Sequence, residues 1–212
     1  MTIFLLLIGS LALRAENDFQ YWSRFQVKVI DTKYVDSINF WDLRFFDDSS
    51  NFGFWQTSQK IQVDLIRNLS LGVAYTYLDN EVANEFKYQH RLELETNPYW
   101  SWKEWVNIRN CNRVEFRWIE DKGSDNGRFR QLLEFEVPIK NISPVQSLYF
   151  NNEIFIDFNQ KELNENRVVP FGITFKVYKK TSFKVSYMIQ SKKTAHDWLS
   201  NQVLGTHLLI AF

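Results

Sequence analysis

Arginine and glutamate occupy alternate positions in three segments of the chain, which is the spacing that places charges on one face of a β-strand. Opposite charges that face each other on neighbouring strands attract by about 0.2–1 kcal/mol per exposed pair. Where water is excluded, an unpaired charge is costly, so these side chains should pair with one another. The predicted charge network comprises Arg91, Glu93, Glu95, Arg113, Glu115, Arg117, Arg130, Glu134, Glu136 and Glu153.

Histidine is scarce, which limits nucleophilic catalysis. His90 shares an apolar face with Leu92 and Leu94, His196 lies in a polar segment, and His207 lies on the polar face of the last segment. A lipid hydrolase needs a serine and a histidine within reach of each other, with a third group that orients the imidazole. No Gly-x-Ser-x-Gly motif occurs. We therefore expect no enzyme, and a hydrolase that uses an outward-facing His90 remains the less favoured alternative.

Acidic pairs at Asp47-Asp48 and Glu120-Asp121 could bind Ca²⁺, but such pairs in polar loops are usually only solvated. No His/Cys cluster has zinc-binding spacing, and the single cysteine, Cys111, excludes an internal disulfide framework. We predict no metal and no cofactor. The 25 basic and 25 acidic residues balance, so nucleic acid is not an expected partner.

The elements that position these residues are predicted to be strands. Apolar and polar residues alternate with period two almost throughout; for example, Val114, Phe116 and Trp118 alternate with Arg113, Glu115 and Arg117. Leu133, Phe135 and Val137 alternate in the same way with Glu134 and Glu136, and no segment keeps a helical period. A soluble barrel or sandwich would alternate too, with its apolar face inside.

The connections between segments are predicted to alternate between short turns and longer polar loops. The short ones include Arg67-Asn68 and residues 179–182, and the long ones are residues 47–52, 79–85, 121–127, 159–165 and 191–200. We count about eleven segments, whereas bacterial single-chain membrane barrels have even strand numbers. We therefore expect an all-β, antiparallel up-and-down transmembrane barrel of about 10–12 strands, with twelve preferred.

Aromatic residues make up 17% of the chain and gather near the ends of the segments. Amphipathic rings favour the headgroup region, and outer-membrane barrels carry girdles of them at both interfaces. This pattern favours a membrane barrel over a soluble one. The residues are Trp22, Tyr34, Trp55, Tyr77, Phe86, Tyr88, Trp100, Trp102, Trp118, Tyr178 and Trp198.

Both ends of the chain fit export to the outer membrane. Ile3 to Leu13 is an apolar run followed by small residues, which predicts a signal peptide over residues 1–15 and a barrel over residues 16–212, although no Lys or Arg precedes the run. At the other end, Leu208, Ile210 and the terminal Phe212 share one face, and Gly205 opens this segment. The pattern resembles the C-terminal strand signal that the barrel-assembly machinery recognises.

The sequence also resembles a known family. Arg91-Leu92-Glu93-Leu94-Glu95, Asn112 to Arg117, Asn152-Glu153, Asn166-Arg167 and a terminal Phe are similar to the bacterial outer-membrane proteins of domain-of-unknown-function family 2490. The resemblance covers about residues 18–212. It implies an outer-membrane barrel without an established activity, so it supports the architecture and supplies no mechanism.

We therefore expect an outer-membrane, porin-like barrel of a Gram-negative bacterium. It would contact outer-membrane lipid, lipopolysaccharide and the barrel-assembly machinery, and the sequence does not fix its oligomeric state. A barrel of this size encloses a lumen far narrower than that of a 16–18-stranded porin. A narrow channel for small solutes is the first hypothesis, and a closed barrel that only displays its loops is the alternative.

Overall fold

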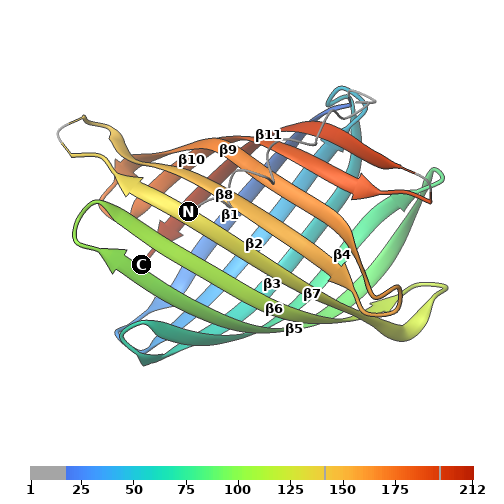
Figure 1. Ribbon diagram of the computed structural model, residues 1–212, viewed down its shortest axis with the longest axis horizontal. Coiled ribbons are helices and arrows are strands. Elements are labelled where there is room, and N and C mark those ends of the chain that lie inside the picture. The colour runs from blue at the N-terminus through green and yellow to red at the C-terminus, as the bar shows by residue number, and fades with distance from the viewer. Residues whose placement is uncertain (1–17, 141, 196) are drawn as a thin grey trace, which may run out of the picture.

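The computed structural model describes residues 18–140, 142–195 and 197–212, and in this part of the chain eleven strands close into one barrel (Figure 1). The predicted signal peptide, residues 1–15, lies outside the described residues. The described residues contain no helix long and apolar enough to cross a membrane. The strands are β1 (Phe19–Asp31), β2 (Val35–Phe46), β3 (Asn51–Ile66), β4 (Leu69–Val82), β5 (Glu85–Trp102), β6 (Val106–Ile119), β7 (Gly123–Pro138), β8 (Val145–Asp157), β9 (Glu162–Tyr178), β10 (Thr181–Lys193) and β11 (Trp198–Ala211).

Consecutive strands pair antiparallel, and the barrel closes through a parallel pair of β1 and β11. The seam register runs from Phe19↔Gln202 to Lys28↔Ala211. Across the seam the Tyr21 hydroxyl lies 2.8 Å from the Thr206 hydroxyl. The expectation of an even strand number, with twelve preferred, is therefore wrong. A parallel closing pair satisfies the backbone groups of both edge strands, so that an odd number of strands leaves no open edge.

The two ends of the barrel carry different turns. We call the end that holds Phe212 and the connections after β1, β3, β5, β7 and β9 the C-terminal rim, and the other end, where β1 starts, the opposite rim. The predicted long loops belong to the opposite rim, yet no described connection there exceeds four residues. The strands continue into the polar segments instead, and tight turns join them. At the β4–β5 turn, Ala83 and Asn84 have φ of 53° and 64°, the conformation of a two-residue hairpin turn that follows the strand twist.

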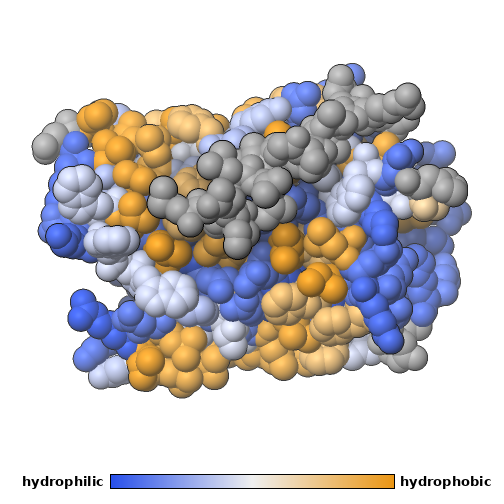
Figure 2. All heavy atoms as spheres, viewed as in Figure 1, coloured by the Kyte–Doolittle hydropathy of each residue, from blue (hydrophilic) through white to orange (hydrophobic). Residues whose placement is uncertain are grey.

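Polarity is inverted relative to a soluble protein. Among the described residues, nine hydrophobic residues are buried, whereas 20 polar or charged residues are buried and 36 large hydrophobic ones are exposed. Apolar side chains cover much of the outer wall, and polar residues gather at the opposite rim, at the right of the view (Figure 2). The lumen, rather than the outer wall, therefore collects the charged face of each strand.

Aromatic rings contact one another in tilted pairs along the outer wall near the opposite rim. Phe45 lies 6.0 Å from Tyr21 and 5.5 Å from Phe52, and Phe52 lies 6.2 Å from Phe86, measured between ring centroids. Near the C-terminal rim, Trp100, Trp102, Trp105, Tyr34 and Tyr178 are exposed. Aromatic residues therefore mark both ends of the outer wall.

Candidate functional site

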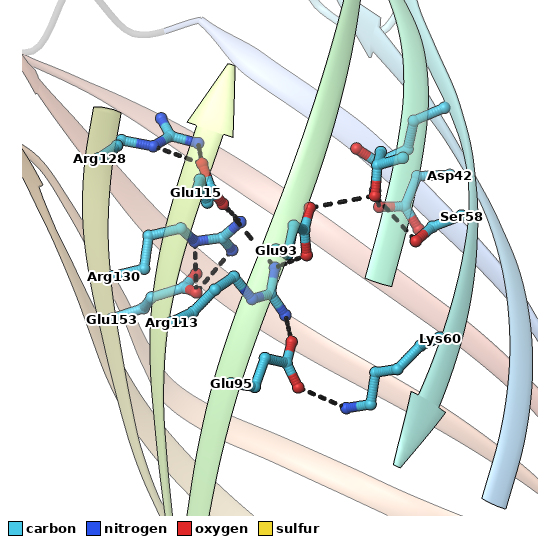
Figure 3. Close-up of polar contacts among 12 residues, drawn as sticks. Asp42, Ser58, Lys60, Glu93, Glu95, Arg113, Glu115, Arg128, Arg130 and Glu153 are labelled. Atoms are coloured by element: carbon cyan, nitrogen blue, oxygen red, sulfur yellow. Dashed lines mark hydrogen bonds and ion pairs between the residues drawn. The ribbon is translucent and has the colours of Figure 1, made fainter. Parts of the chain in front are cut away.

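Glu115 on β6 is the most enclosed charge of the lumen, with no exposed surface. Its neighbours on β7 are Arg128 and Arg130, which lie two residues apart and therefore on the same face of the strand. One carboxylate oxygen of Glu115 lies 2.6 Å from an Arg128 Nη and the other lies 2.6 Å from an Arg130 Nη. Two guanidinium groups thus compensate one buried carboxylate (Figure 3).

Arg113 continues the chain of ion pairs toward β5 and β3. Its guanidinium lies between the carboxylates of Glu93, at 2.9 Å, and Glu95, at 2.5 Å (Figure 3). Lys60 reaches Glu95 at 2.7 Å across β4. Gly72 of β4 pairs with Glu95, and an added Cβ there would lie 3.2 Å from the carboxylate oxygen that Lys60 approaches. The lack of a side chain at Gly72 leaves room for this contact.

Glu153 on β8 extends the ion pairs in the other direction. It accepts from Arg130 at 2.6 Å, and Arg167 on β9 lies 3.6 Å from its second oxygen. Arg167 also donates to Glu165 at 2.7 Å. We call this continuous set the charged network: Lys60, Glu93, Glu95, Arg113, Glu115, Arg128, Arg130, Glu153, Glu165 and Arg167.

The structure brings together six of the ten predicted network residues: Glu93, Glu95, Arg113, Glu115, Arg130 and Glu153. The other four lie elsewhere. Arg117 pairs with Asp157 at 2.9 Å, and Glu134 and Glu136 both pair with Arg109. Arg91 lines the lumen and has no ion pair in the described part of the chain.

The sequence reading missed several charged partners. Lys60, Arg128, Glu165 and Arg167 belong to the charged network, and Arg24 forms a two-bond pair with Asp42 at 2.6 and 2.7 Å. All of them occupy polar positions of alternating segments. The prediction considered only segments in which two or three charged residues alternate. Including single charged residues at polar positions of the other segments would have found them.

The wall beside the seam is apolar. Trp22, Tyr149, Val169, Met188 and Val203 pack together, and we call them the seam cluster. Three small residues separate Trp22 from Tyr149 across the strands: Trp22 pairs with Gly205, Gly205 with Ser186, Ser186 with Gly172, and Gly172 with Tyr149. A Cβ at Gly172 would overlap the Tyr149 ring. The Tyr149 ring therefore lies over Gly172 inside the barrel.

Guanidinium groups lie over aromatic rings of the lumen and connect the seam cluster to charged residues of other strands. The Arg44 guanidinium lies 3.8 Å from the Trp22 ring centroid and 4.0 Å from that of Phe54. Arg167 lies 5.0 Å from Trp22 and 4.4 Å from Phe155. Such contacts contribute about 0.5–2 kcal/mol each, depending on desolvation.

A cavity of about 590 Å³ remains inside the barrel. In the described part of the chain, its lining holds five acidic residues, namely Asp42, Glu93, Glu134, Glu153 and Glu165. The same lining holds eleven Arg and Lys residues, namely Arg24, Arg44, Lys60, Arg91, Arg113, Arg117, Arg128, Arg130, Arg167, Lys184 and Lys192. The chain as a whole is neutral, so positive charge is concentrated in the lumen.

The remaining candidate residues are spread over the barrel. His90 lies among outer-wall tyrosines, with its Nδ1 2.6 Å from the Tyr75 hydroxyl, whereas His207 lines the cavity. His196 is outside the described residues. No group of His, Cys, Asp and Glu within the described ranges is arranged to hold a metal ion.

The predicted C-terminal signal lies on β11. Gly205 faces the cavity, whereas Leu208 pairs with Phe183 of β10 and Phe25 of β1, and Ile210 pairs with Thr181. Phe212 is exposed, and its amide donates to the Lys28 carbonyl at 3.3 Å.

Comparison with known proteins gives one family and two distant structures. The family model described as "Protein of unknown function (DUF2490)" matches residues 19–201. No curated protein matches the chain. A structure described as "Bacterial polysaccharide outer membrane secretin" is 7% identical with a TM-score of 0.49, covering 81% of this chain and 73% of that chain. A chain from "Unveiling the Mechanism Behind the in-meso Crystallization of Membrane Proteins" is 10% identical with a TM-score of 0.42, covering 84% and 76%.

Proposed function

Because this chain belongs to the DUF2490 family, whose description assigns no function, we propose from its geometry that it is an outer-membrane β-barrel with a narrow passage for small anionic solutes. The observation that carries the proposal is the inverted polarity of a closed barrel around a charged cavity. Soluble monomers rarely expose continuous apolar patches larger than a few hundred Å². Membrane barrels have an apolar outer band, aromatic girdles and a polar interior.

The sign of the lumen charge supports a preference for anions. Of the described residues, eleven basic and five acidic ones line the cavity. Glu95 and Glu115 compensate part of this excess from behind the arginines. Rings of Arg and Lys side chains favour anions in other pores, because they lower the electrostatic barrier for negative solutes.

A closed barrel without conduction is the second candidate, and the charged network is the observation that favours it. Glu93, Glu95 and Glu115 are almost wholly buried behind arginines. Ion pairs this dense narrow the lumen. The two candidates share the same location and differ only in conductance.

The location is tested first. We expect the protein in the outer-membrane fraction, with a faster-migrating unheated form on a detergent gel. A protein that stays soluble without detergent would contradict the membrane proposal.

Conduction is tested in planar bilayers that separate two KCl concentrations. We expect small discrete current steps and a reversal potential on the anion-selective side. Lys192→Glu should shift that potential toward cation selectivity, because it reverses one charge of the lining. Folded protein that inserts without current steps would favour the closed barrel, and a cation-selective wild type would contradict the anion preference.

A further inference from the structure

Among the described residues, two arginines of the cavity have no carboxylate partner of the kind that the other lumen arginines have. Arg24, Arg113, Arg128, Arg130 and Arg167 each bind at least one carboxylate. Arg44 and Arg91 line the same cavity, yet within the described ranges neither forms an ion pair, and the Nε of each is buried without a hydrogen-bond partner. Their charge is therefore uncompensated by direct contact.

The surroundings of Arg44 fix the plane of its guanidinium. The rings of Trp22 and Phe54 lie against it at 3.8 and 4.0 Å. All five N–H donors of an arginine lie in the plane of the guanidinium, so stacked rings leave the edges of the group as its donor sites. Trp22 is itself held by a hydrogen bond from its indole to Gln20, at 3.0 Å. The donor edge of Arg44 is thus oriented before any ligand arrives.

Two carboxylates that act electrostatically on Arg44 are already bound to other residues. Arg44 is within electrostatic range of Asp42 and Glu165. Asp42 accepts two hydrogen bonds from Arg24 and one from Gln56 at 2.8 Å. Glu165 accepts from Arg167 and Gln190. Neither carboxylate bonds to Arg44 in this arrangement.

The carboxylates around Arg91 are likewise bound to other residues. Its electrostatic neighbours include Glu115 and Glu93, but also Arg128 and Arg130. Glu115 is bound by Arg128 and Arg130, and Glu93 is bound by Arg113 and by Thr76 at 3.0 Å. Arg91 and Arg44 are also within electrostatic range of each other. Two uncompensated guanidinium groups therefore face one cavity.

We propose that Arg44 and Arg91 form a binding site for a small oxyanion, a carboxylate or a phosphate, inside the lumen. Arginine forks match both groups through paired N–H donors, and a partly desolvated guanidinium gains most from such a partner. The cavity, about 590 Å³, is in the range of small-molecule pockets. The inference deepens the proposed passage by naming its substrate class, and it rests on that proposal only for the route by which the ligand enters.

Binding is measured by titration calorimetry on the folded barrel in detergent, with succinate and inorganic phosphate as separate probes and chloride as a comparison. We expect saturable one-to-one binding of at least one oxyanion, and the stronger probe identifies the class. Arg44→Gln and Arg91→Gln should each weaken it by about tenfold or more, the usual effect of losing a charged hydrogen bond. Arg91→Lys should weaken it less than Arg91→Gln, since the charge remains and only the fork is lost.

Lys184→Gln is the matched control. Lys184 lines the same cavity without an ion pair among the described residues, but its charged neighbours are Glu134, Arg109, Glu136 and Arg24. We expect this variant to reduce anion selectivity in bilayers and to weaken oxyanion binding far less than Arg44→Gln or Arg91→Gln does. Heat-modifiable migration identifies variants that fold.

If neither succinate nor phosphate binds saturably, the proposed site is wrong. It is also wrong if Lys184→Gln weakens binding as much as Arg44→Gln and Arg91→Gln do. Binding by a barrel that carries no current would support the site and overturn the passage, so the two proposals fail separately.

Discussion

The charged network and the seam cluster line adjoining parts of one lumen, since both include residues of β8 and β9, and they are stabilised by different forces. In the network, each buried carboxylate is held by one or more cationic groups, and removing one partner leaves an uncompensated charge. In the seam cluster, Trp22 packs against Tyr149 and its apolar neighbours, and the Tyr149 ring lies over Gly172, so the fit of their volumes decides the stability. The difference shows that a barrel interior can be ordered either by charge pairing or by shape.

The placement of the two regions follows the closure of the barrel. The network spans β3 to β9, where antiparallel hairpins set the register between neighbours. The cluster lies at β8 to β11 and β1, around the parallel pair that joins the two ends of the chain. Trp22 contacts both regions, because Arg167 of the network stacks on its ring.

The largest effect is expected at the centre of the charged network. Glu115→Gln removes the charge that faces Arg128 and Arg130. Breaking a buried pair by removing one partner costs about 3–5 kcal/mol, so we expect the free energy of unfolding to fall by that amount. Urea unfolding in detergent, followed by tryptophan fluorescence, measures it.

Glu162→Gln is the control for this change. It removes the same charge from the half-exposed pair with Lys193 near the opposite rim. Exposed pairs are worth about 0–1 kcal/mol, so little should change. Equal effects of the two variants would mean that burial does not distinguish the network.

The seam cluster should respond to added volume instead of lost charge. Gly172→Ala places a methyl group where the Tyr149 ring lies. Overpacking of this kind costs about 1–3 kcal/mol, measured by the same unfolding experiment. Adding Tyr149→Val should recover part of the stability, because it frees the space. A double variant that is additive would show that the ring does not limit position 172.

Alternation identified the faces and the number of strand segments, because period two is a local property of the chain. The parallel seam could not be read in this way, since pairing between the ends depends on whether the whole barrel closes with β1 beside β11. The even-number rule excluded the observed count of eleven.

The ion-pair partner of each charged residue could not be predicted from the sequence either. Arg91 and Arg113 occupy equivalent polar positions, yet only Arg113 has ion pairs among the described residues. Which arginine meets which glutamate depends on register shifts, such as the one between Arg117 and Ile119, where β6 meets β7. Alternation predicts whether a side chain points into the lumen or outward, but not where along the barrel axis it lies.

The smallest effect concerns the contact between the two regions. A double-mutant cycle of Trp22→Leu and Arg167→Met measures whether the seam cluster and the charged network stabilise each other. We expect a coupling free energy of about 0.5–1 kcal/mol, because the guanidinium lies 5.0 Å from the ring centroid. Trp22→Leu with Arg113→Met is the control cycle, since Arg113 pairs with Glu93 and Glu95 instead. That cycle should be additive within about 0.5 kcal/mol. Equal coupling in both cycles would mean that Trp22 stabilises the lumen as a whole. The distinction between a region ordered by charge pairing and one ordered by shape would then fail at the contact between Trp22 and Arg167.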